Sequence, residues 1–254
     1  MRILLKLGGT LLDEENTRAD LARQIAGAAA QLVVVHGGGK QMTRFLTERG
    51  IESKFINGLR VTTPEVVDAV LKVFAGSVNH QLVAALVAAG ADAVGLSGID
   101  AGLAEADQLD PELGAVGRVV RSNPRILEVL TASGFLPVVA CLAGDAKGNI
   151  YNVNADQMAV ACASAFKAER LLFLTDVDGV RGENGSILST LTVAQGRDLV
   201  TRGIATGGME AKLNAAASAL ENGVGEVIIA SGAAPKILAR LLSGAALGTK
   251  LTAI

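Results

Sequence analysis

Aromatic residues and cysteine are scarce in this chain of 254 residues. It contains no Trp, one Tyr and six Phe, so large rings cannot dominate its core. Its two cysteines, Cys141 and Cys162, cannot build a disulfide framework, and a reducing cytosol is the simplest setting for them. Ala, Val, Leu and Gly dominate instead, and half of the residues are hydrophobic. That mixture favours parallel strands that are buried on both faces and alternate with helices of small residues.

An excess of charge of one sign is also missing. Lys and Arg total 23 against 25 Asp and Glu, which gives a formal net charge of −2 without a basic block. We therefore expect no nucleic-acid partner, because proteins that bind nucleic acids carry clustered positive charge. The chain begins in an expected strand at Arg2, which leaves no room for a signal peptide. No uninterrupted apolar run reaches the roughly 18 residues of a membrane helix, so we expect a cytoplasmic protein without membrane contact.

Strand and helix patterns alternate along most of the chain, which predicts an α/β fold. We expect strands at 2–7, 32–36, 92–97, 135–142, 170–175, 225–231 and 249–253. We expect helices within 16–30 and 40–49 and at 64–89, 124–133, 155–166, 192–202, 209–221 and 235–243. Units in this order specify a mainly parallel open sheet with right-handed crossovers. The polar segments 53–62, 99–122 and 148–153 are interpreted as hairpins or short antiparallel strands outside that sheet.

Two of the expected strands run straight into glycines. Residues 3–9 read Ile-Leu-Leu-Lys-Leu-Gly-Gly, and residues 32–40 read Leu-Val-Val-Val-His-Gly-Gly-Gly-Lys. Glycine lets bare backbone amides approach a ligand, and the N-terminus of a following helix adds further donors. Two such turns on neighbouring strands suit a phosphoryl group that passes between two ligands. Neither turn is a Walker A loop, because Lys6 precedes its glycines and no Ser or Thr directly follows Lys40.

Five short segments, taken in order, resemble the amino acid kinase family. They lie at 6–9, 36–39, 57–62, 152–156 and 207–209, the last together with Lys212. The resemblance covers essentially the whole chain, and it is greatest to members that phosphorylate the side-chain carboxylate of N-acetyl-L-glutamate with ATP in arginine biosynthesis. It implies a single domain over 1–254, folded as a three-layer αβα sandwich with β-hairpins over the substrate site. A lobe of about 1–170 would bind the acceptor and dimerise, and a lobe of about 171–254 would bind ATP.

The resemblance implies that Lys6, Lys212 and Asp156 are the catalytic residues. Phosphoryl transfer is accelerated when cations and oriented amides bind the charge on the transferring group. Lys6 is placed to do so from one side, at a strand end, and Lys212 from the other, one turn into a helix. A solvated surface charge is the usual state of Lys, and for Lys212 only the resemblance outweighs that interpretation. Asp156 would hold both lysines by ion pairing, while Asn154 serves as the helix cap.

Contacts to the acceptor are expected from Gly38, Gly39, Arg60 and Asn152. The planar guanidinium of Arg60 suits bidentate capture of an α-carboxylate. The amide of Asn152 can donate and accept at once, which matches an acetylated α-nitrogen. Gly38 and Gly39 would meet the acceptor and the γ-phosphate through backbone amides. The acceptor carboxyl, with a pKa of about 4.3, is already ionised at neutral pH, so no general base is needed.

The resemblance places most of the ATP contacts in the C-terminal part of the chain. The expected contacts are Gly8, Gly9, Thr175, Asp176, Val177, Asp178, Gly179, Val180, Arg181, Ile204, Ala205, Thr206, Gly208 and Met209. Taken alone, Asp178-Gly179 is an ordinary turn. His36 and His80 are the only histidines and lack ligand-like spacing to Cys or Asp, so we expect no metal site built by the protein. Mg²⁺ would arrive with ATP, held mainly by phosphates and water.

Two positions depart from the family pattern. Cys141 ends an expected strand where the family more often has Ser and Pro, and Ile99 replaces a more usual Lys. Cys141 is interpreted as a small buried hydrophobe rather than a reactive thiol. Arginine-sensitive members carry a helix before the first strand, whereas this chain starts almost on that strand. We therefore expect a homodimer that arginine does not inhibit.

Three rival functions stand beside this interpretation. Phosphorylation of acetylaminoadipate in lysine biosynthesis differs by one methylene, which a pocket separates by about 1–3 kcal/mol, and the Asn-Gly-Leu-Arg-Val-Thr segment at 57–62 favours the glutamate derivative. A nicotinamide-dependent oxidoreductase needs a G-x-G-x-x-G loop, but Lys-Gln-Met follows the glycines at 37–39. A non-catalytic binding module would not require both Lys6 and Lys212.

Overall fold

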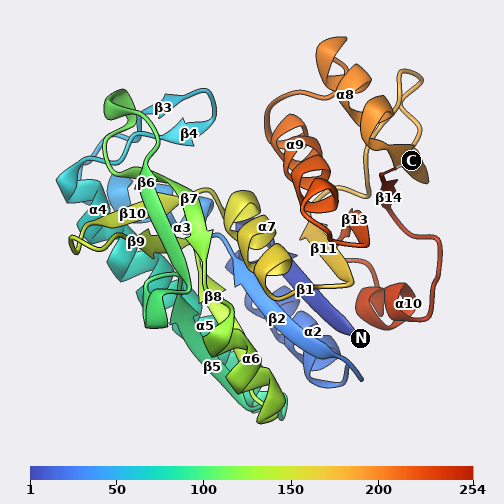
Figure 1. Cartoon of the computed structure of the whole chain (residues 1–254), viewed down its shortest axis with the longest axis horizontal. Coiled ribbons are helices and arrows are strands. Elements are labelled where there is room, and N and C mark those ends of the chain that lie inside the picture. The colour runs from blue at the N-terminus through green and yellow to red at the C-terminus, as the bar shows by residue number, and fades with distance from the viewer. Residues whose placement is uncertain (254) are drawn as a thin grey trace.

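The computed structural model describes residues 1–253, and one eight-stranded sheet forms its centre (Figure 1). The strands run in the order β12-β14-β13-β11-β1-β2-β8-β5. Neighbouring strands are parallel except for β13 and β14, which confirms the mainly parallel sheet predicted from the alternation. Their bounds are β1 (Arg2–Leu7), β2 (Gln31–His36), β5 (Ala93–Ser97), β8 (Leu136–Ala140), β11 (Arg170–Thr175), β12 (Thr190–Thr192), β13 (Glu226–Ser231) and β14 (Thr249–Thr252).

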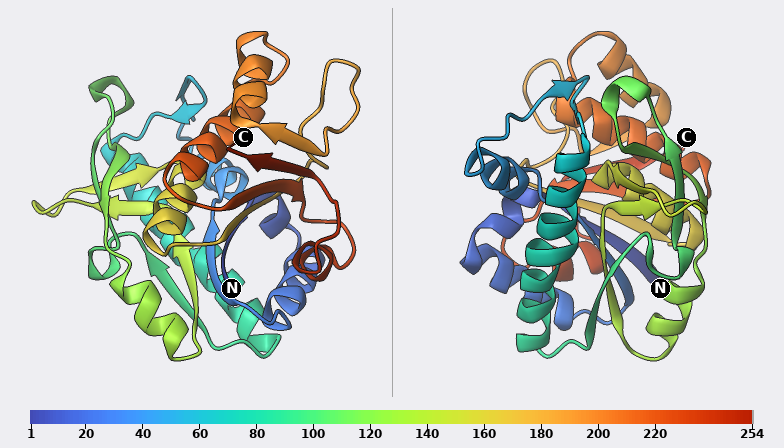
Figure 2. Two further views of the ribbon diagram at one scale, coloured as in Figure 1. Left: turned by 45° about the vertical axis from the view of Figure 1, so that its right-hand side comes forward. Right: turned by 90° about the vertical axis from the view of Figure 1, so that its left-hand side faces the viewer.

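Helices cover both faces of this sheet, so the three-layer αβα sandwich is confirmed (Figures 1 and 2). One face carries α6 (Arg125–Ala132), α7 (Ala155–Ala165), α8 (Val193–Thr201) and α9 (Gly207–Glu221). The other carries α1 (Gly9–Asp13), α2 (Glu15–Ala26), α3 (Gly39–Thr47), α5 (Asn79–Ala88) and α10 (Ile237–Leu242). The expected helices are all present, within a few residues of their predicted bounds. The short α1 and the edge strand β12 were not predicted, because neither is long enough to show a period.

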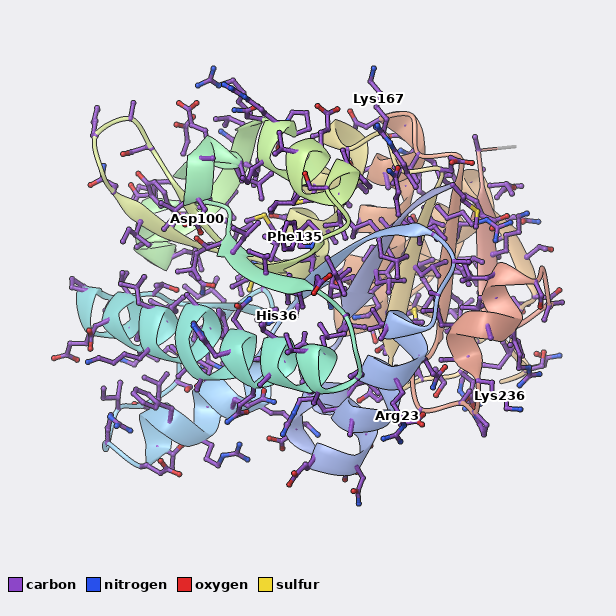
Figure 3. The ribbon with its side chains drawn as sticks, turned by 90° about the horizontal axis from the view of Figure 1, so that it is seen from below. Arg23, His36, Asp100, Phe135, Lys167 and Lys236 are labelled. Atoms are coloured by element: carbon purple, nitrogen blue, oxygen red, sulfur yellow. The ribbon has the colours of Figure 1, made fainter. Side chains whose placement is uncertain are left out.

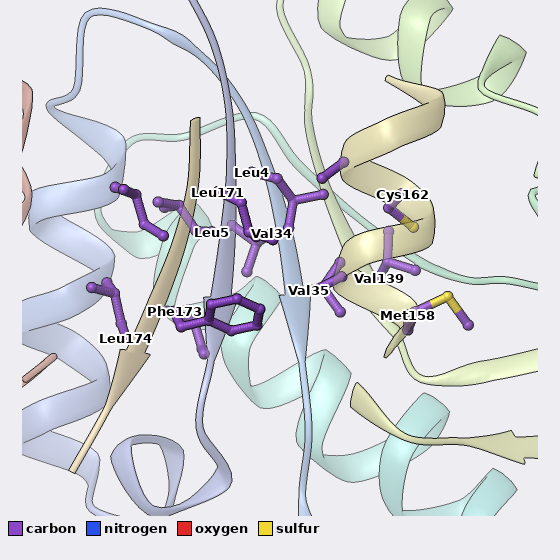
Figure 4. Packing of buried hydrophobic residues seen from close by; sticks show 14 of the residues in the cluster. Leu4, Leu5, Val34, Val35, Val139, Met158, Cys162, Leu171, Phe173 and Leu174 are labelled. Atoms are coloured by element: carbon purple, nitrogen blue, oxygen red, sulfur yellow. The ribbon is translucent and has the colours of Figure 1, made fainter. Parts of the chain in front are cut away.

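The core lies where the central strands meet the two helical layers. Leu4, Val34 and Phe173 are fully buried on β1, β2 and β11, and Met158 and Cys162 pack onto this region from α7 (Figure 4). These strands are continuous apolar runs rather than alternating ones, as a parallel sheet covered on both faces requires. The same burial fixes where the strands end, and the two glycine turns lie at those ends.

A long helical segment over 64–88 flanks the edge of the sheet. It consists of α4 (Pro64–Val70), the π-helix η1 (Leu71–Val78) and α5. The side chain of Thr63 accepts a hydrogen bond from the Val66 amide at 3.4 Å, so the predicted Thr-Pro helix start is confirmed. By length and composition alone this helix could cross a membrane. In the structure it packs against β5, β8 and α2, and 39% of its most apolar window is buried.

The polar segments form small sheets beside the main one. β6 (Ala104–Gln108), β7 (Val116–Ser122), β9 (Leu142–Gly144) and β10 (Ile150–Val153) close into a barrel, and β3 (Phe55–Ile56) pairs with β4 (Leu59–Arg60). The short turns η2 (Asp100–Gly102) and η3 (Pro111–Leu113) border β6. The prediction of one strand over 135–142 is wrong, because the chain leaves the main sheet at Cys141 and enters the barrel as β9. Barrel closure joins segments that are distant in sequence, and local patterns do not encode it.

Candidate active site

The two glycine turns lie against each other. β1 and β2 are parallel neighbours, and Leu7 at the end of β1 is in register with His36 at the end of β2. A Cβ atom on Gly9 would lie only 3.2 Å from the Gly38 Cα and from the Gly39 nitrogen. The absence of a side chain at Gly9 therefore lets the two turns approach this closely. As the sequence predicted, the backbone amides of both turns lie in one place, next to the N-terminus of α3.

Three charged side chains meet beside these turns. Lys6 Nζ lies 2.5 Å from Asp156 Oδ1, and Lys212 Nζ lies 3.4 Å from Asp156 Oδ2. Lys6 comes from β1, Asp156 from the first turn of α7 and Lys212 from α9, three elements that lie together in Figure 1. The Lys6 and Asp156 side chains are 9% and 8% exposed, so this is an ion pair of the interior rather than of the surface.

The charge balance of this cluster favours an anionic ligand. Burial acts to raise the pKa of the Asp156 carboxyl, but the positive charges of Lys6 and Lys212 outweigh it and leave that pKa below its ordinary value. The carboxylate is therefore ionised at neutral pH. Two ammonium groups then face one carboxylate, and the cluster carries an excess positive charge next to two turns rich in backbone donors.

Asn154 caps α7 as the sequence predicted. Its side-chain oxygen accepts hydrogen bonds from the amides of Asp156 at 2.9 Å and of Gln157 at 3.3 Å. Because Asn154 satisfies the free amides of the helix start, the Asp156 carboxylate is free to face the two lysines. One residue therefore caps the helix and its neighbour pairs with the lysines.

Arg60 is buried among neutral partners. Its guanidinium donates to Thr43 Oγ1 at 2.8 Å, to the Gly39 carbonyl at 3.3 Å and to Ser53 Oγ, and it stacks 4.6 Å from the centre of the Phe55 ring. Within residues 1–253 no carboxylate forms an ion pair with it, and burial lowers its pKa. A guanidinium in this setting is a ready partner for the carboxylate of a ligand.

Thr62 links the two residues expected to bind the acceptor. Its hydroxyl accepts from Asn152 Nδ2 at 3.1 Å and donates to the Arg60 carbonyl at 2.9 Å, and the residue is fully buried. Thr62 closes the segment 57–62 that the sequence analysis singled out, but its partner lies on β10. The sequence held no signal for that link.

The first of the segments expected to bind the nucleotide starts beside the first glycine turn. The Gly8 amide donates to the Leu174 carbonyl at 2.9 Å, which places Thr175 directly beside that turn. From there the loop 176–181 leads away and is held by Thr249, whose hydroxyl accepts from the Val180 amide at 2.7 Å. The other segment, 204–209, leads into α9, which carries Lys212.

A cavity of about 1280 Å³ opens at the cluster and extends between α7 and α9. Asp156, Lys212 and Gly208 line one end of it, and the β3–β4 hairpin reaches it through residues 57–59. Lys6, Arg60 and Asn152 do not line this cavity. The structure therefore joins the three charged residues to one another, while Arg60 contacts the second glycine turn at the Gly39 carbonyl.

The fold and the site together define an α/β domain of the phosphotransferase type. The profile of the Amino acid kinase family matches residues 1–231. The chain belongs to that family.

The most similar relatives among those compared are acetylglutamate kinases. The chain is 65% identical over 254 residues to the acetylglutamate kinase of Solibacter usitatus (strain Ellin6076), with 99% of each chain covered. It is 45% identical to the acetylglutamate kinase of Acidobacterium capsulatum, covering 96% of this chain and 95% of that one. The likeness to these enzymes spans the full length, so the resemblance drawn from five short segments is confirmed.

Solved structures agree on the fold. A protein of Streptococcus mutans UA159 superposes with a TM-score of 0.86 at 31% identity, covering 100% of this chain and 99% of that one. The N-acetylglutamate synthase of Neisseria gonorrhoeae, complexed with coenzyme A and N-acetyl-glutamate, gives a TM-score of 0.87 at 26% identity. The match covers 99% of this chain but 59% of the synthase.

Proposed function

We infer that this chain is an acetylglutamate kinase. It transfers the γ-phosphoryl group of ATP to the side-chain carboxylate of N-acetyl-L-glutamate and forms N-acetyl-L-glutamyl 5-phosphate, a step of arginine biosynthesis. The observation that carries this inference is the buried cluster of Lys6, Asp156 and Lys212 beside two glycine turns. Relatives that match this chain over nearly its full length, at 65% and 45% identity, are acetylglutamate kinases.

The two lysines are proposed to stabilise the charge of the transferring phosphoryl group from opposite sides. Lys6 reaches it from β1 and Lys212 from α9, while Asp156 holds both ammonium groups by one oxygen each. The amides of Gly8, Gly9, Gly38 and Gly39 supply neutral donors. Fixed donors of this kind act where charge develops in the transition state.

Arg60 and Asn152 are proposed to bind the acceptor. Arg60 supplies a buried guanidinium without a carboxylate partner among residues 1–253, which fits the α-carboxylate of an amino acid. Asn152 fits the acetamido group, and Thr62 links the Asn152 side chain to the Arg60 backbone. The nucleophile is a carboxylate that is ionised at neutral pH, so the reaction proceeds without a general base.

The nucleotide is proposed to bind mainly in the lobe of about 171–254, and the acceptor in the lobe of about 1–170. The contacts proposed for the nucleotide are those of the segments 175–181 and 204–209 together with Gly8 and Gly9. Within residues 1–253 no cluster of three His, Cys, Asp or Glu side chains could hold a metal ion. Mg²⁺ is proposed to come with the phosphates, and no step of this mechanism passes through it.

Turnover with a panel of acceptors tests this function. ATP consumption is measured with acetylglutamate, acetylaminoadipate, glutamate and aspartate, and the acyl phosphate is trapped with hydroxylamine. We expect acetylglutamate to give the highest kcat/KM. A higher value with acetylaminoadipate would assign the enzyme to lysine biosynthesis instead, and no turnover with any of the four would refute a kinase of this class.

We further propose a cytoplasmic homodimer. Support comes from the position of β5 as the last strand of the sheet and from large apolar side chains that are exposed on neighbouring elements, among them Val87 on α5, Val129 on α6 and Phe135 before β8. Sedimentation velocity at micromolar concentration checks the assembly. A monomer or a hexamer would contradict it, and inhibition of turnover by added arginine would contradict the expected insensitivity.

A further inference from the structure

A buried histidine lies at the base of the second glycine turn, and the mechanism above does not use it. His36 ends β2, is fully buried and lies inside the molecule between the sheet and the long helix (Figure 3). Its Nδ1 is 3.0 Å from the carbonyl oxygen of Gly37, and its Nε2 is 2.9 Å from Asn79 Nδ2. Both ring nitrogens therefore have partners, and one of those partners is the backbone of the turn itself.

The partners determine where the ring proton lies. Asn79 Nδ2 also lies 2.9 Å from the Val138 carbonyl, which can only accept, so this end of the amide is the donor. His36 Nε2 must then accept from Asn79, and Nδ1 carries the proton and donates to the Gly37 carbonyl. Burial lowers the pKa of His36 to about 4, so the ring is neutral at physiological pH.

Asn79 is held in place on two sides. It is 2% exposed, and it lies opposite Gly95 on β5, where any Cβ would collide with the Asn79 side-chain oxygen. The hydrogen bonds therefore run without a break from Val138 on β8, through Asn79 and His36, to Gly37. This network connects three elements to the one carbonyl that precedes Gly38 and Gly39.

The π-helix η1 packs against the second glycine turn. A Cβ on Gly38 would lie 2.9 Å from Phe74 Cδ1 and 3.4 Å from Val78 Cγ2. The side chains of Phe74 and Val78, both on η1, therefore pack against that glycine. A π-helix pairs residues five apart, which turns Asn79 toward the side of the helix that also carries Phe74. In a regular α-helix these two positions would face different directions. The π-helix thus places the Phe74 ring against Gly38 and the Asn79 amide against His36.

We propose that His36 and Asn79, backed by Phe74, are positioning residues that hold the Gly38 and Gly39 amides toward the transferring phosphoryl group. The proposal rests on the proposed kinase function and goes beyond it, because both side chains are buried and neither lines the cavity at the charged cluster. Amides that act chiefly in the transition state affect kcat when they are misplaced, and they affect KM little.

Substitutions at His36 separate positioning from mere support of the fold. His36→Leu keeps the volume and removes both hydrogen bonds, and we expect kcat to fall about 10- to 100-fold with both KM values within about twofold of the wild type. His36→Asn can still donate to the Gly37 carbonyl and should recover most of kcat. Asn79→Ala should lower kcat to an intermediate value. Leu86→Ala, also buried in α5 but further from the turn, is the matched control, with a lower melting temperature and an unchanged kcat.

Several results of these measurements would overturn the positioning role of His36. An unchanged kcat in folded His36→Leu, or a His36→Asn variant no better than His36→Leu, would overturn the positioning role. So would a loss that appears only in KM. If His36→Leu does not fold, Asn79→Ala and His36→Asn carry the same comparison against Leu86→Ala. Absence of turnover in the wild type would instead refute the kinase function itself, so the two failures are distinguishable.

Discussion

The ammonium of Lys6 and the carboxylate of Asp156 form an ion pair of 2.5 Å inside the protein, with each side chain less than one-tenth exposed. A pair of this kind is expensive to desolvate and is a weak source of stability. Its position beside two glycine turns, together with the second cation Lys212, agrees instead with a role in chemistry.

Removal of either lysine should slow the chemical step. Lys6→Ala and Lys212→Ala are each expected to lower kcat by about 100- to 1000-fold, as the loss of a fixed transition-state donor does elsewhere. The KM values for ATP and acceptor should change much less, because the interaction strengthens only as charge develops. Steady-state kinetics with acetylglutamate measures both. A loss confined to KM would contradict the assignment.

Asp156→Asn should lower the free energy of unfolding as well as the rate of phosphoryl transfer. It leaves the buried Lys6 ammonium without an anion, which costs about 3–5 kcal/mol when one member of a buried pair is removed. Asp68→Asn is the matched control, because Asp68 pairs with Lys72 on the surface with both side chains more than half exposed, and such pairs contribute about 0–1 kcal/mol. Urea unfolding of both variants provides the comparison. Equal midpoints would show that the buried pair is not structurally required.

Arg60→Ala should act chiefly on the acceptor. A hydrogen bond to a charged group is worth about 1.5–3 kcal/mol, so KM for acetylglutamate should rise about 10- to 100-fold while KM for ATP stays near its original value. Arg49→Ala is a suitable control, since Arg49 stacks on Phe45 at the surface. If KM for acetylglutamate is unchanged in Arg60→Ala, Arg60 is not in the acceptor site.

Thr62→Val should raise the same KM through its neighbours. The variant keeps the shape of the side chain but removes the hydroxyl that joins Asn152 to the Arg60 backbone. We expect a rise of about 3- to 10-fold, the worth of one ordinary hydrogen bond. The adjacent Thr63→Val removes a helix cap instead, so it should lower stability by about 1 kcal/mol without changing KM. Identical effects of the two substitutions would argue against a specific link.

Acid should destabilise the protein in a window set by His36. Its pKa falls from 6.5 to about 4 on folding, so between these values the unfolded chain binds a proton that the folded chain does not. Stability therefore decreases as the pH falls through that window, by up to about 3 kcal/mol in total. Asp156 adds a further loss at lower pH, because its pKa is below the ordinary value in the folded state. Thermal melting between pH 7 and pH 4 measures this, and His36→Asn should show the flatter curve.

Sequence patterns over a few neighbouring residues predicted the buried strands and the helix starts of this fold. Continuous apolar runs predicted β1, β2 and β11, and the Thr-Pro pair at 63–64 predicted a helix start. The barrel and the break at Cys141 were beyond reach, because they depend on pairing between strands that lie far apart in the chain. The π-helix η1 was also beyond reach, since its sequence is as suitable for an α-helix.

The sequence by itself determined the family, the two glycine turns and the identity of the charged residues, because each is carried by a short run of neighbouring residues. The family resemblance also implied that Asp156 pairs with Lys6 and Lys212, and the structure brings the three side chains together. Only the tertiary structure decided that Thr62 joins Asn152 to Arg60 and that His36 and Asn79 lie in one hydrogen-bond network behind the second turn. The physical reason is the range of the interactions. Backbone preferences and hydrophobic periods act over a few residues, whereas buried ion pairs and hydrogen bonds form between whichever side chains the packed sheet brings together.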